Sequence, residues 1–435
     1  MKFNQQFSSK FRILSKGRVV LAISVIAANI LHASPEVNAL PTNPSIVSGN
    51  ININAPSSNT LNINQASNKG IINWGSFNIG SAATVNFKQP NVNSSTLNRV
   101  VGGGLSQIAG NLNANGNVIL INPNGVVFQN GSRVDVGSIT ASTMNLKDED
   151  FLNDKLNFTR DGNIGKVINK GTITAKDKGY VALLAPEVQN DGVIKAVQGS
   201  VAFASGDAIT LDLDGDGLLN VEVEAATIDT LIENKGLVQA DGGLVYMSSK
   251  AATDAYASTV SNSGKVSASS MEEVGGKIVF LGSDITNEGT LEAKGKTGGG
   301  EILVGGDWQG ANSEIYHEAT TVTATKDSII DASATESGDG GKVVLWSDIK
   351  DKNSITSVKG IINAKGGEVL GDGGKVETSG KDIQINDLKV STQATNGKTG
   401  NWLIDPDKIY IQNGGTDSIT GTTIDADTVV SALST

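Results

Sequence analysis

The sequence predicts an all-β protein whose main part is a parallel β-helix that follows a cleaved signal peptide. Three observations predict this fold class. Apolar residues alternate with Asn over long stretches, Asn-Gly and Gly-Gly pairs separate short alternating runs, and one motif recurs along the chain. In such a solenoid each coil buries its apolar side chains by stacking on its neighbours.

The composition limits both the core and the possible partners. The chain has 435 residues, of which 38% are hydrophobic but only 4% aromatic. This favours a narrow tube filled with small aliphatic side chains over a core of large rings. A net charge of -11 disfavours binding to nucleic acid or anionic lipid. The absence of Cys excludes a disulfide framework and Cys-based zinc sites.

The N-terminal residues have the pattern of an export signal. Residues 1–18 carry five basic and no acidic side chains, and Val19–Leu31 is an apolar run of 13 residues. That run is shorter than the roughly 20 residues that span a bilayer, so a signal peptide is predicted in preference to a membrane anchor. Val37-Asn38-Ala39 resembles a signal peptidase site. We expect cleavage after Ala39, with Ala33 as a second candidate.

After Ser48 the chain has the period of half-buried strands. Asn50–Asn54 and Leu61–Asn64 place apolar side chains on one face and Asn on the other. The Asn-Gly and Gly-Gly pairs between such runs supply the positive φ angles of tight turns. The best helical pattern, Asp148–Leu156, is short.

The motif Asn-x-Gly-x-aliphatic-x-Ala predicts the length of one coil. It begins at Asn169, Asn190, Asn234, Asn262 and Asn287, and its successive glycines are 21, 44, 28 and 25 residues apart. We interpret the interval of 44 as two steps of 22, which gives a coil of roughly 20 to 28 residues. A β-sandwich array is the competing architecture, but it requires antiparallel hairpins at regular spacing.

Short motifs that are typical of one family occur in the expected order: Asn68–Phe77, Val85–Phe87, Leu97–Val100, Asn117–Phe128, Val134–Thr143, Asp150-Phe151, Phe158, Gly298–Trp308, Gly338–Asp348 and Gly400–Pro406. With these motifs the chain resembles two-partner secretion exoproteins with a filamentous haemagglutinin-type N-terminal domain, also called the haemagglutination activity domain. The resemblance implies that the β-helix is right-handed. It also implies a secretion domain over residues 40–290 and continuing coils over residues 291–435.

The resemblance further implies a partner and a recognition motif. In this family the secretion domain is recognised by an outer-membrane transporter barrel with periplasmic transport-associated repeats. Asn122-Pro123-Asn124-Gly125 matches the family's Asn-Pro-Asn-Gly motif, which either contacts the transporter or supports the turn that it forms. The family's second motif, Asn-Pro-Asn-Leu, has only a poor counterpart in Gln89–Val92.

The export route gives the absence of Cys a mechanistic interpretation. A disulfide that closed a loop in the oxidising periplasm would block a chain that must cross an outer-membrane pore unfolded. Coil-by-coil folding outside the cell would then draw the chain forward, since each stacked coil buries more apolar area.

One acidic segment resembles the first half of a calcium-binding loop. Asp212, Asp214 and Asp216 occupy positions 1, 3 and 5, and Gly217 occupies position 6. Position 12 is Val223, where a calcium loop has Glu. Calcium binding and a solvated turn between coils are the two alternatives, and we predict no metal site.

Few residues are suited to catalysis or to sugar stacking. After the signal the only His is His317, so acid-base and nucleophilic sites would depend on a single residue. Trp74, Trp308, Trp346 and Trp402 could stack on sugars, or they could cap the tube and fill its corners. We therefore predict that the chain is not an enzyme and has no cofactor.

The sequence predicts an adhesin or haemagglutinin-type exoprotein that is secreted or held at the cell surface after passing the periplasm. Host-cell glycans or proteins are its expected targets. The alternatives are the delivery stalk of a contact-dependent toxin or haemolysin, and a polysaccharide-active β-helix enzyme. Because residues 418–430 still follow the repeat, we expect the β-helix to be truncated at Thr435.

Overall fold

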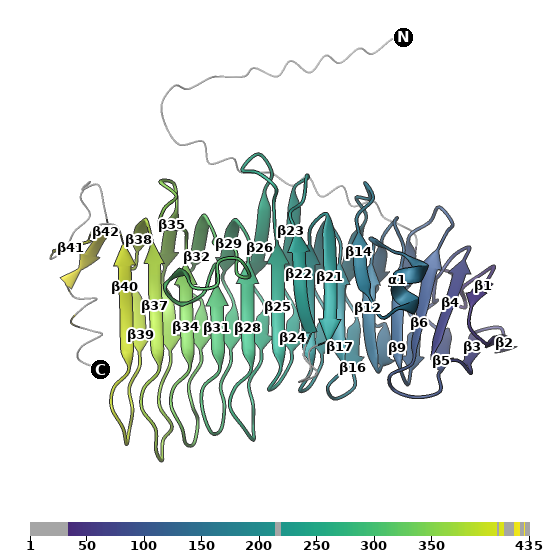
Figure 1. Ribbon diagram of the computed structural model, residues 1–435. Helices are drawn as coiled ribbons and strands as arrows, with labels where there is room; N and C mark the ends of the chain where they lie inside the picture. The colour runs from purple at the N-terminus through teal and green to yellow at the C-terminus, as the bar shows by residue number, and fades with distance from the viewer. Residues whose placement is uncertain (1–33, 214–218, 407–408, 413–421, 427–429, 431–435) are drawn as a thin grey trace, which may run out of the picture. The chain divides into compact units, whose positions relative to one another are not determined.

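The computed structural model describes residues 34–213, 219–406, 409–412, 422–426 and 430 (Figure 1). The chain winds through three sheets in turn, and each coil adds one strand to each sheet. Residues 1–33 of the predicted signal peptide, including Ala33, lie outside the described residues, whereas residues 34–39 are described. No helix within them is long and apolar enough to cross a membrane.

Three long sheets form the sides of the coil. Sheet 1 contains β1 Ser45–Ser48, β4 Lys69–Trp74, β6 Ser95–Val100, β9 Asn117–Ile121, β12 Ser138–Ser142, β17 Tyr180–Leu184, β20 Ser200–Ser205, β25 Leu244–Ser249, β28 Lys277–Leu281, β31 Glu301–Val304, β34 Lys342–Trp346, β37 Lys375–Gly380 and β40 Asn401–Pro406. Sheet 2 contains β7 Ser106–Ile108, β10 Val126–Phe128, β15 Lys166–Asn169, β18 Glu187–Asn190, β23 Thr230–Asn234, β26 Ser258–Asn262, β29 Asp284–Asn287, β32 Thr321–Ala324, β35 Ile355–Val358 and β38 Asp382–Gln384. Sheet 3 contains β2 Ile51–Ser57, β3 Thr60–Gln65, β5 Thr84–Lys88, β8 Asn111–Ala114, β11 Arg133–Val136, β16 Thr172–Ala175, β19 Val193–Lys195, β24 Leu237–Gln239, β27 Lys265–Ser267, β30 Thr290–Glu292, β33 Ile329–Asp331, β36 Gly360–Asn363 and β39 Leu388–Ser391.

Neighbouring strands in these sheets are parallel, except at the N-terminal end. There β1 pairs antiparallel with β4, and β2 pairs antiparallel with β3. These reversed strands cover the edges that the first parallel coil would otherwise expose. The predicted parallel β-helix is therefore confirmed, and the β-sandwich alternative is wrong.

The core is a column of stacked aliphatic side chains. On sheet 2, for example, Val126, Val167, Val188, Ile232 and Val260 are in register from coil to coil and fully buried. Each residue packs on an equivalent one about 4.8 Å above and below it, so β-branched side chains fill the tube with few rings.

The repeated Asn residues form a ladder inside the corner between sheets 2 and 3. Asn169, Asn190, Asn234, Asn262 and Asn287 are buried, and each Nδ2 donates to the Oδ1 of the next at 2.7 to 2.8 Å. The glycines of the motif follow at the same corner. A Cβ at Gly236 would lie only 2.0 Å from the carbonyl oxygen of Gly192, so the stacked backbones leave no room for a side chain.

Two details of the sequence prediction are wrong. The interval of 44 residues is a single coil, because β18 pairs directly with β23 and Asn190 with Asn234. The extra residues of this coil project from the β-helix and form a hairpin of β21 Ala208–Leu213 and β22 Leu219–Glu224. The expected helix is also shorter, since α1 covers only Asp148–Leu152.

This hairpin completes a small antiparallel sheet on the outside of sheet 1. The outer sheet has the order β13 Asn145–Leu146, β14 Leu156–Thr159, β21 and β22. Apolar residues of the outer sheet and α1 pack on outward residues of sheet 1 and form a second core, which includes Ile119, Phe151, Phe158 and Leu211. Two further elements are η1 Trp308–Gly310, beside the same face, and a parallel pair of β41 Ile409–Gln412 and β42 Thr422–Asp425.

Candidate functional site

The Asn-Pro-Asn-Gly motif forms the corner between β9 in sheet 1 and β10 in sheet 2. The Gly125 amide donates to the Asn122 carbonyl at 2.9 Å, and the Asn124 amide donates to Asn122 Oδ1 at 3.0 Å. Gly125 has a φ of 121°, a conformation that favours glycine. The expected turn geometry is therefore present, with Pro123 at its second position.

Asn122 fixes this corner to the preceding coil. Its side chain is fully buried, and Nδ2 donates to the Gly104 carbonyl at 2.9 Å and to Ser106 Oγ at 3.0 Å. Asn124 Nδ2 reaches the Gly102 carbonyl at 3.2 Å. The first Asn of the motif thus supports the fold and is not accessible to a partner.

Exposed apolar side chains flank the same corner. Val101, on the loop that Asn124 contacts, is 64% exposed. Ile164 is 76% exposed and precedes Gly165, where a Cβ would lie 2.4 Å from the Pro123 carbonyl oxygen. The motif therefore has a buried structural side and an exposed side bordered by apolar residues.

The segment Gln89–Val92 lies at a different corner, between β5 in sheet 3 and β6 in sheet 1. The Gln89 side chain is nearly buried, donates to Thr96 Oγ1 at 3.0 Å and accepts from the Gly116 amide at 2.9 Å. It connects neighbouring coils and is not a structural counterpart of Asn122.

The calcium hypothesis depends partly on residues outside the described part of the chain. Asp212 is exposed on β21, whereas Asp214 and Asp216 are not described. Val223 pairs with Ile209 in the outer sheet. Among the described residues, no three His, Cys, Asp or Glu side chains come together as metal ligands would.

His317 is placed where it cannot readily act as an acid or base. Burial and, to a lesser extent, the positive charge of Lys250 lower the pKa of its imidazole to about 4. Nε2 lies 3.2 Å from the Ser249 carbonyl oxygen. At neutral pH the ring is therefore an uncharged packing residue.

The four Trp residues divide into two pairs. Trp74 and Trp346 are buried and cannot stack on sugars. Trp308 and Trp402 are half-buried, and the ring of Trp308 lies 5.9 Å from Lys375 Nζ. Trp74 belongs to the core of the tube, whereas Trp346 belongs to the second core outside sheet 1.

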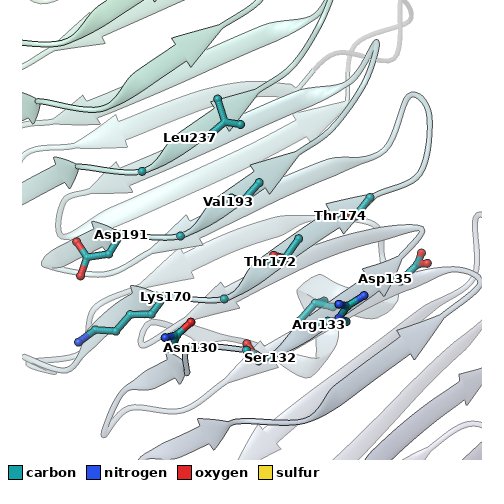
Figure 2. Close-up of a pocket in the computed structure, with 15 residues that line it drawn as sticks. Asn130, Ser132, Arg133, Asp135, Lys170, Thr172, Thr174, Asp191, Val193 and Leu237 are labelled. Atoms are coloured by element: carbon teal, nitrogen blue, oxygen red, sulfur yellow. The ribbon is translucent and has the colours of Figure 1, made fainter.

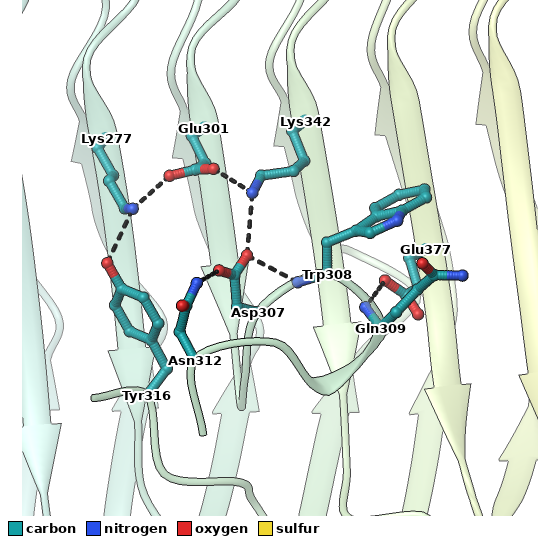
Figure 3. Close-up of polar contacts among 9 residues, drawn as sticks. All are labelled: Lys277, Glu301, Asp307, Trp308, Gln309, Asn312, Tyr316, Lys342 and Glu377. Atoms are coloured by element: carbon teal, nitrogen blue, oxygen red, sulfur yellow. Dashed lines mark hydrogen bonds and ion pairs between the residues drawn. The ribbon is translucent and has the colours of Figure 1, made fainter. Parts of the chain in front are cut away.

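A network of charged residues lies on the outside of sheet 1 after the outer sheet ends (Figure 3). Glu301 forms ion pairs with both Lys277 and Lys342, which precede and follow it in register. Lys342 also pairs with Asp307 at 2.9 Å, and Lys277 donates to the Tyr316 hydroxyl at 3.0 Å. Every carboxylate and ammonium of this network is paired, so it fastens the loop that carries Asp307 and Tyr316.

The same loop is held at two further points. Asp307 accepts from the Trp308 amide at 2.7 Å and from Asn312 Nδ2 at 2.8 Å. Burial pushes the pKa of Asp307 up, but these hydrogen bonds and Lys342 lower it below its ordinary value. The Gln309 amide donates to the buried Glu377 carboxylate at 2.8 Å. Sequence reasoning missed this network, although Lys277, Glu301 and Lys342 each directly follow a Gly-Gly pair.

Comparison with known proteins identifies the first part of this solenoid. The family described as "TPS secretion domain" matches residues 38–293. The crystal structure of the HMW1 secretion domain from Haemophilus influenzae has a TM-score of 0.66 and 29% identity, and the match covers 84% of this chain and 100% of that one. These matches are secretion domains of exoproteins and not enzymes.

Two curated relatives from Haemophilus influenzae carry the name heme/hemopexin-binding protein. One is 31% identical over 312 residues, which is 70% of this chain and 34% of the relative. The other is 29% identical over 337 residues, which is 72% of this chain and 36% of the relative. The chain thus spans about a third of the length of these relatives. The motif corner and the β-helix agree with these matches. The chain therefore belongs to the TPS family of secretion domains, through which a two-partner secretion exoprotein engages a dedicated outer-membrane transporter for export.

Proposed function

We propose that this chain is the export-directing part of a haemagglutinin-type surface adhesin. Residues 40–290 would form the secretion domain, and the coils over 291–435 would begin the exported fibre. The observation that supports this proposal is continuity: the same three-sheet coil runs past residue 293, where the family match ends, to β40. A protein that extends by adding identical coils presents its surface far from the membrane, as adhesion requires.

We infer that the transporter is a barrel with periplasmic repeats and that these repeats recognise the exposed side of the Asn122–Gly125 corner. Val101 and Ile164 flank this corner and are more than half exposed. Exposed apolar side chains beside a fixed turn are typical of a surface that is covered by a partner. The buried side of the motif would act only by fixing the shape of that surface.

The test distinguishes a loss of contact with the transporter from a loss of folding. The double variant Val101→Ser with Ile164→Ser removes exposed apolar area without touching the hydrogen bonds of Asn122. When it is expressed with its outer-membrane transporter, we expect secretion to fall while the unfolding transition of the purified chain stays unchanged. Val369→Ser with Leu370→Ser is the matched control, since both residues are 65% exposed but lie on a distant corner. Equal secretion of both double variants would contradict the proposal.

The position of signal cleavage can be tested on the secreted protein. The carbonyl oxygens of Val37 and Ala39 accept hydrogen bonds at 2.9 Å from the amides of Ala82 and Gly80. Cleavage after Ala39 would remove these bonds, whereas cleavage after Ala33 would keep them. We therefore propose the second candidate, Ala33, as the processing site. N-terminal sequencing should start at Ser34, and a start at Leu40 would support the first candidate.

Capture of a haem-carrying host protein is a second candidate function, favoured by the name of the two curated relatives. His317 is half-buried and its Nε2 lies against the Ser249 carbonyl oxygen, so we expect contact with the carrier protein and not ligation of haem iron by this residue. Purified chain should retain hemopexin with and without bound haem to the same extent. Binding of free haem that is lost in His317→Ala would contradict this expectation.

A further inference from the structure

A polar groove runs over the outside of sheet 3 across four consecutive coils (Figure 2). Its volume of about 710 Å³ lies within the range of small-molecule sites. The groove exists because the corner beside it carries Gly171, Gly192 and Gly236, whose stacked backbones exclude side chains. Its floor is therefore backbone, and its walls are the outward side chains of β11, β16, β19 and β24.

The groove contains cations without a partner. Of the three arginines among the described residues, Arg99 pairs with Asp148 and Arg160 with Asp207. No ion pair or side-chain hydrogen bond is found within the described structure for the third, Arg133, which is exposed in the groove. The same holds for Lys170 on the next coil. An unpaired guanidinium is unexpected on so acidic a chain and is suited to bidentate binding of a carboxylate or sulfate.

Uncharged and acidic groups surround these cations. The hydroxyls of Thr172 and Thr174 also lack a hydrogen-bond partner within the described residues, and Thr172 is in register with Arg133. Asp135 and Asp191 line the groove and can accept hydrogen bonds from hydroxyl groups. The buried Oγ of Ser132, on the same wall, has no hydrogen-bond partner in the described structure.

We propose that this groove binds an acidic oligosaccharide. One acidic group of the sugar pairs with Arg133 and a second with Lys170, whose side chains point away from each other (Figure 2), and its hydroxyl groups bond to Thr172, Thr174 and Asp135. Four coils span about 14 Å, which is too long for a single small anion. A peptide would gain little here, because β11 and β16 are already paired on both sides and cannot accept an added strand. Val193 and Leu237 at the far end offer the sugar rings an apolar surface.

Binding is measured on the purified folded chain, so the result does not depend on the export proposal. The probes are hyaluronan tetrasaccharide, the acidic core oligosaccharide of lipopolysaccharide, and neutral chitotetraose. We expect at least one acidic probe to bind in titration calorimetry and chitotetraose not to bind. Which acidic probe binds more tightly distinguishes a host source from a bacterial one. Inorganic sulfate at the same concentration should not displace the sugar.

Two variants locate the site. Arg133→Gln with Lys170→Gln should weaken binding of the acidic probe by about tenfold or more, because two charge-assisted hydrogen bonds are lost. Lys389→Gln is the matched control, since it removes an exposed cation from the same outward row of sheet 3 several coils away. The proposal is overturned if neither acidic probe binds, if chitotetraose binds equally well, or if the control weakens binding as much as the double variant. Unchanged thermal unfolding of the variants should confirm that the groove itself is intact.

Discussion

The coils up to β29 and the coils after it follow the same three-sheet path but are held together by different polar interactions. Five buried asparagines link the earlier coils from Asn169 to Asn287. In the next two coils the positions in register with Asn287 are Ala324 and Val358, and the ladder ends. A ladder of amides specifies register, because a shifted strand would leave buried donors unpaired. The later coils use buried hydroxyl contacts instead, since Thr356 Oγ1 lies 2.9 Å from Ser347 Oγ and 2.8 Å from the Ser379 carbonyl oxygen.

The outside of sheet 1 is also covered in two ways, but here the charged contacts lie over the later coils. Over the earlier coils the outer sheet buries rings such as Phe158 against apolar residues of sheet 1. From β28 onward a loop is fastened by Lys277, Glu301, Lys342 and Asp307, while Trp308 and Tyr316 of that loop also pack on apolar residues of sheet 1. Apolar cover is insensitive to pH and salt, whereas ion pairs respond to both. The two regions should therefore have similar folds but different responses to solution conditions.

The largest expected effect is one that the two regions share, namely a block of export by a cross-link. Ser261→Cys with Thr286→Cys places a disulfide between in-register positions of the earlier coils, and Thr323→Cys with Ser357→Cys does so in the later coils. Both pairs should abolish secretion under oxidising conditions, because each closes a loop before the chain crosses the pore. Reductant should restore it, and the four single Cys variants serve as controls. Unimpaired secretion of the oxidised pairs would contradict the interpretation of the missing Cys.

The second effect should appear only in the earlier coils. Asn234→Ala removes three side-chain hydrogen bonds and leaves the Nδ2 of Asn190 and the Oδ1 of Asn262 buried without a partner. We expect the free energy of unfolding to fall by about 3 kcal/mol, as measured by denaturant titration. Asn113→Ala is the control, because it breaks an Asn-Asn bond of 2.9 Å to Asn86 on the outer surface of sheet 3. A similar loss of unfolding free energy in both variants would show that burial does not increase the stabilising effect of the Asn–Asn bonds.

The third effect belongs to the later coils. Asp307→Asn removes the charge that pairs with Lys342 but keeps the hydrogen bond from the Trp308 amide. We expect a loss of about 1 to 2 kcal/mol, seen as faster hydrogen exchange over residues 306–318. Asp284→Asn, an exposed change in sheet 2 at a residue that forms no ion pair with another described residue, should leave that exchange unchanged. Because the pKa of Asp307 is lowered in the folded chain, its contribution is present above its ordinary range and is lost as the pH falls through the folded value.

The tube could be predicted from sequence because its signals are local and repeated. Alternation in Leu61–Asn64 and the spacing of the Asn-x-Gly motif require only neighbouring coils to stack. The turn of Asn122–Gly125 could be predicted equally well, since Pro123 fixes its own φ and Gly125 permits a positive φ. The burial of Asn122 could not, because its partners are the carbonyl of Gly104 and the hydroxyl of Ser106 in another coil.

The outer sheet and the charged network escaped prediction for a physical reason. β14 pairs with β21, about 50 residues later, and nothing in either strand's alternation distinguishes this pairing from a further coil. One signal was present in Asn117–Ile121, whose continuous apolar run indicates a strand that is buried on both faces. The charges at 277, 301 and 342 alternate in sign, but only the coil register shows that they are neighbours.

The smallest expected effect is a change in the pH dependence of unfolding at Glu377, a residue of the later coils. Burial raises the pKa of the Glu377 carboxyl above its ordinary value, although the Gln309 amide and Ser379 partly offset this. A raised pKa means that the folded chain holds the proton more tightly, so this group's stabilising contribution is lost as the pH rises from the ordinary Glu range through the folded value. Glu377→Gln keeps an acceptor for Gln309 and should be more stable than the parent above that range by about 1 kcal/mol or less, with no advantage at lower pH. Thermal unfolding across the acidic range measures the difference, and Glu314→Gln, an exposed change on the same loop, should show none. A Glu377→Gln variant that loses stability at neutral pH would mean that its charge fastens the loop as the charge of Asp307 does.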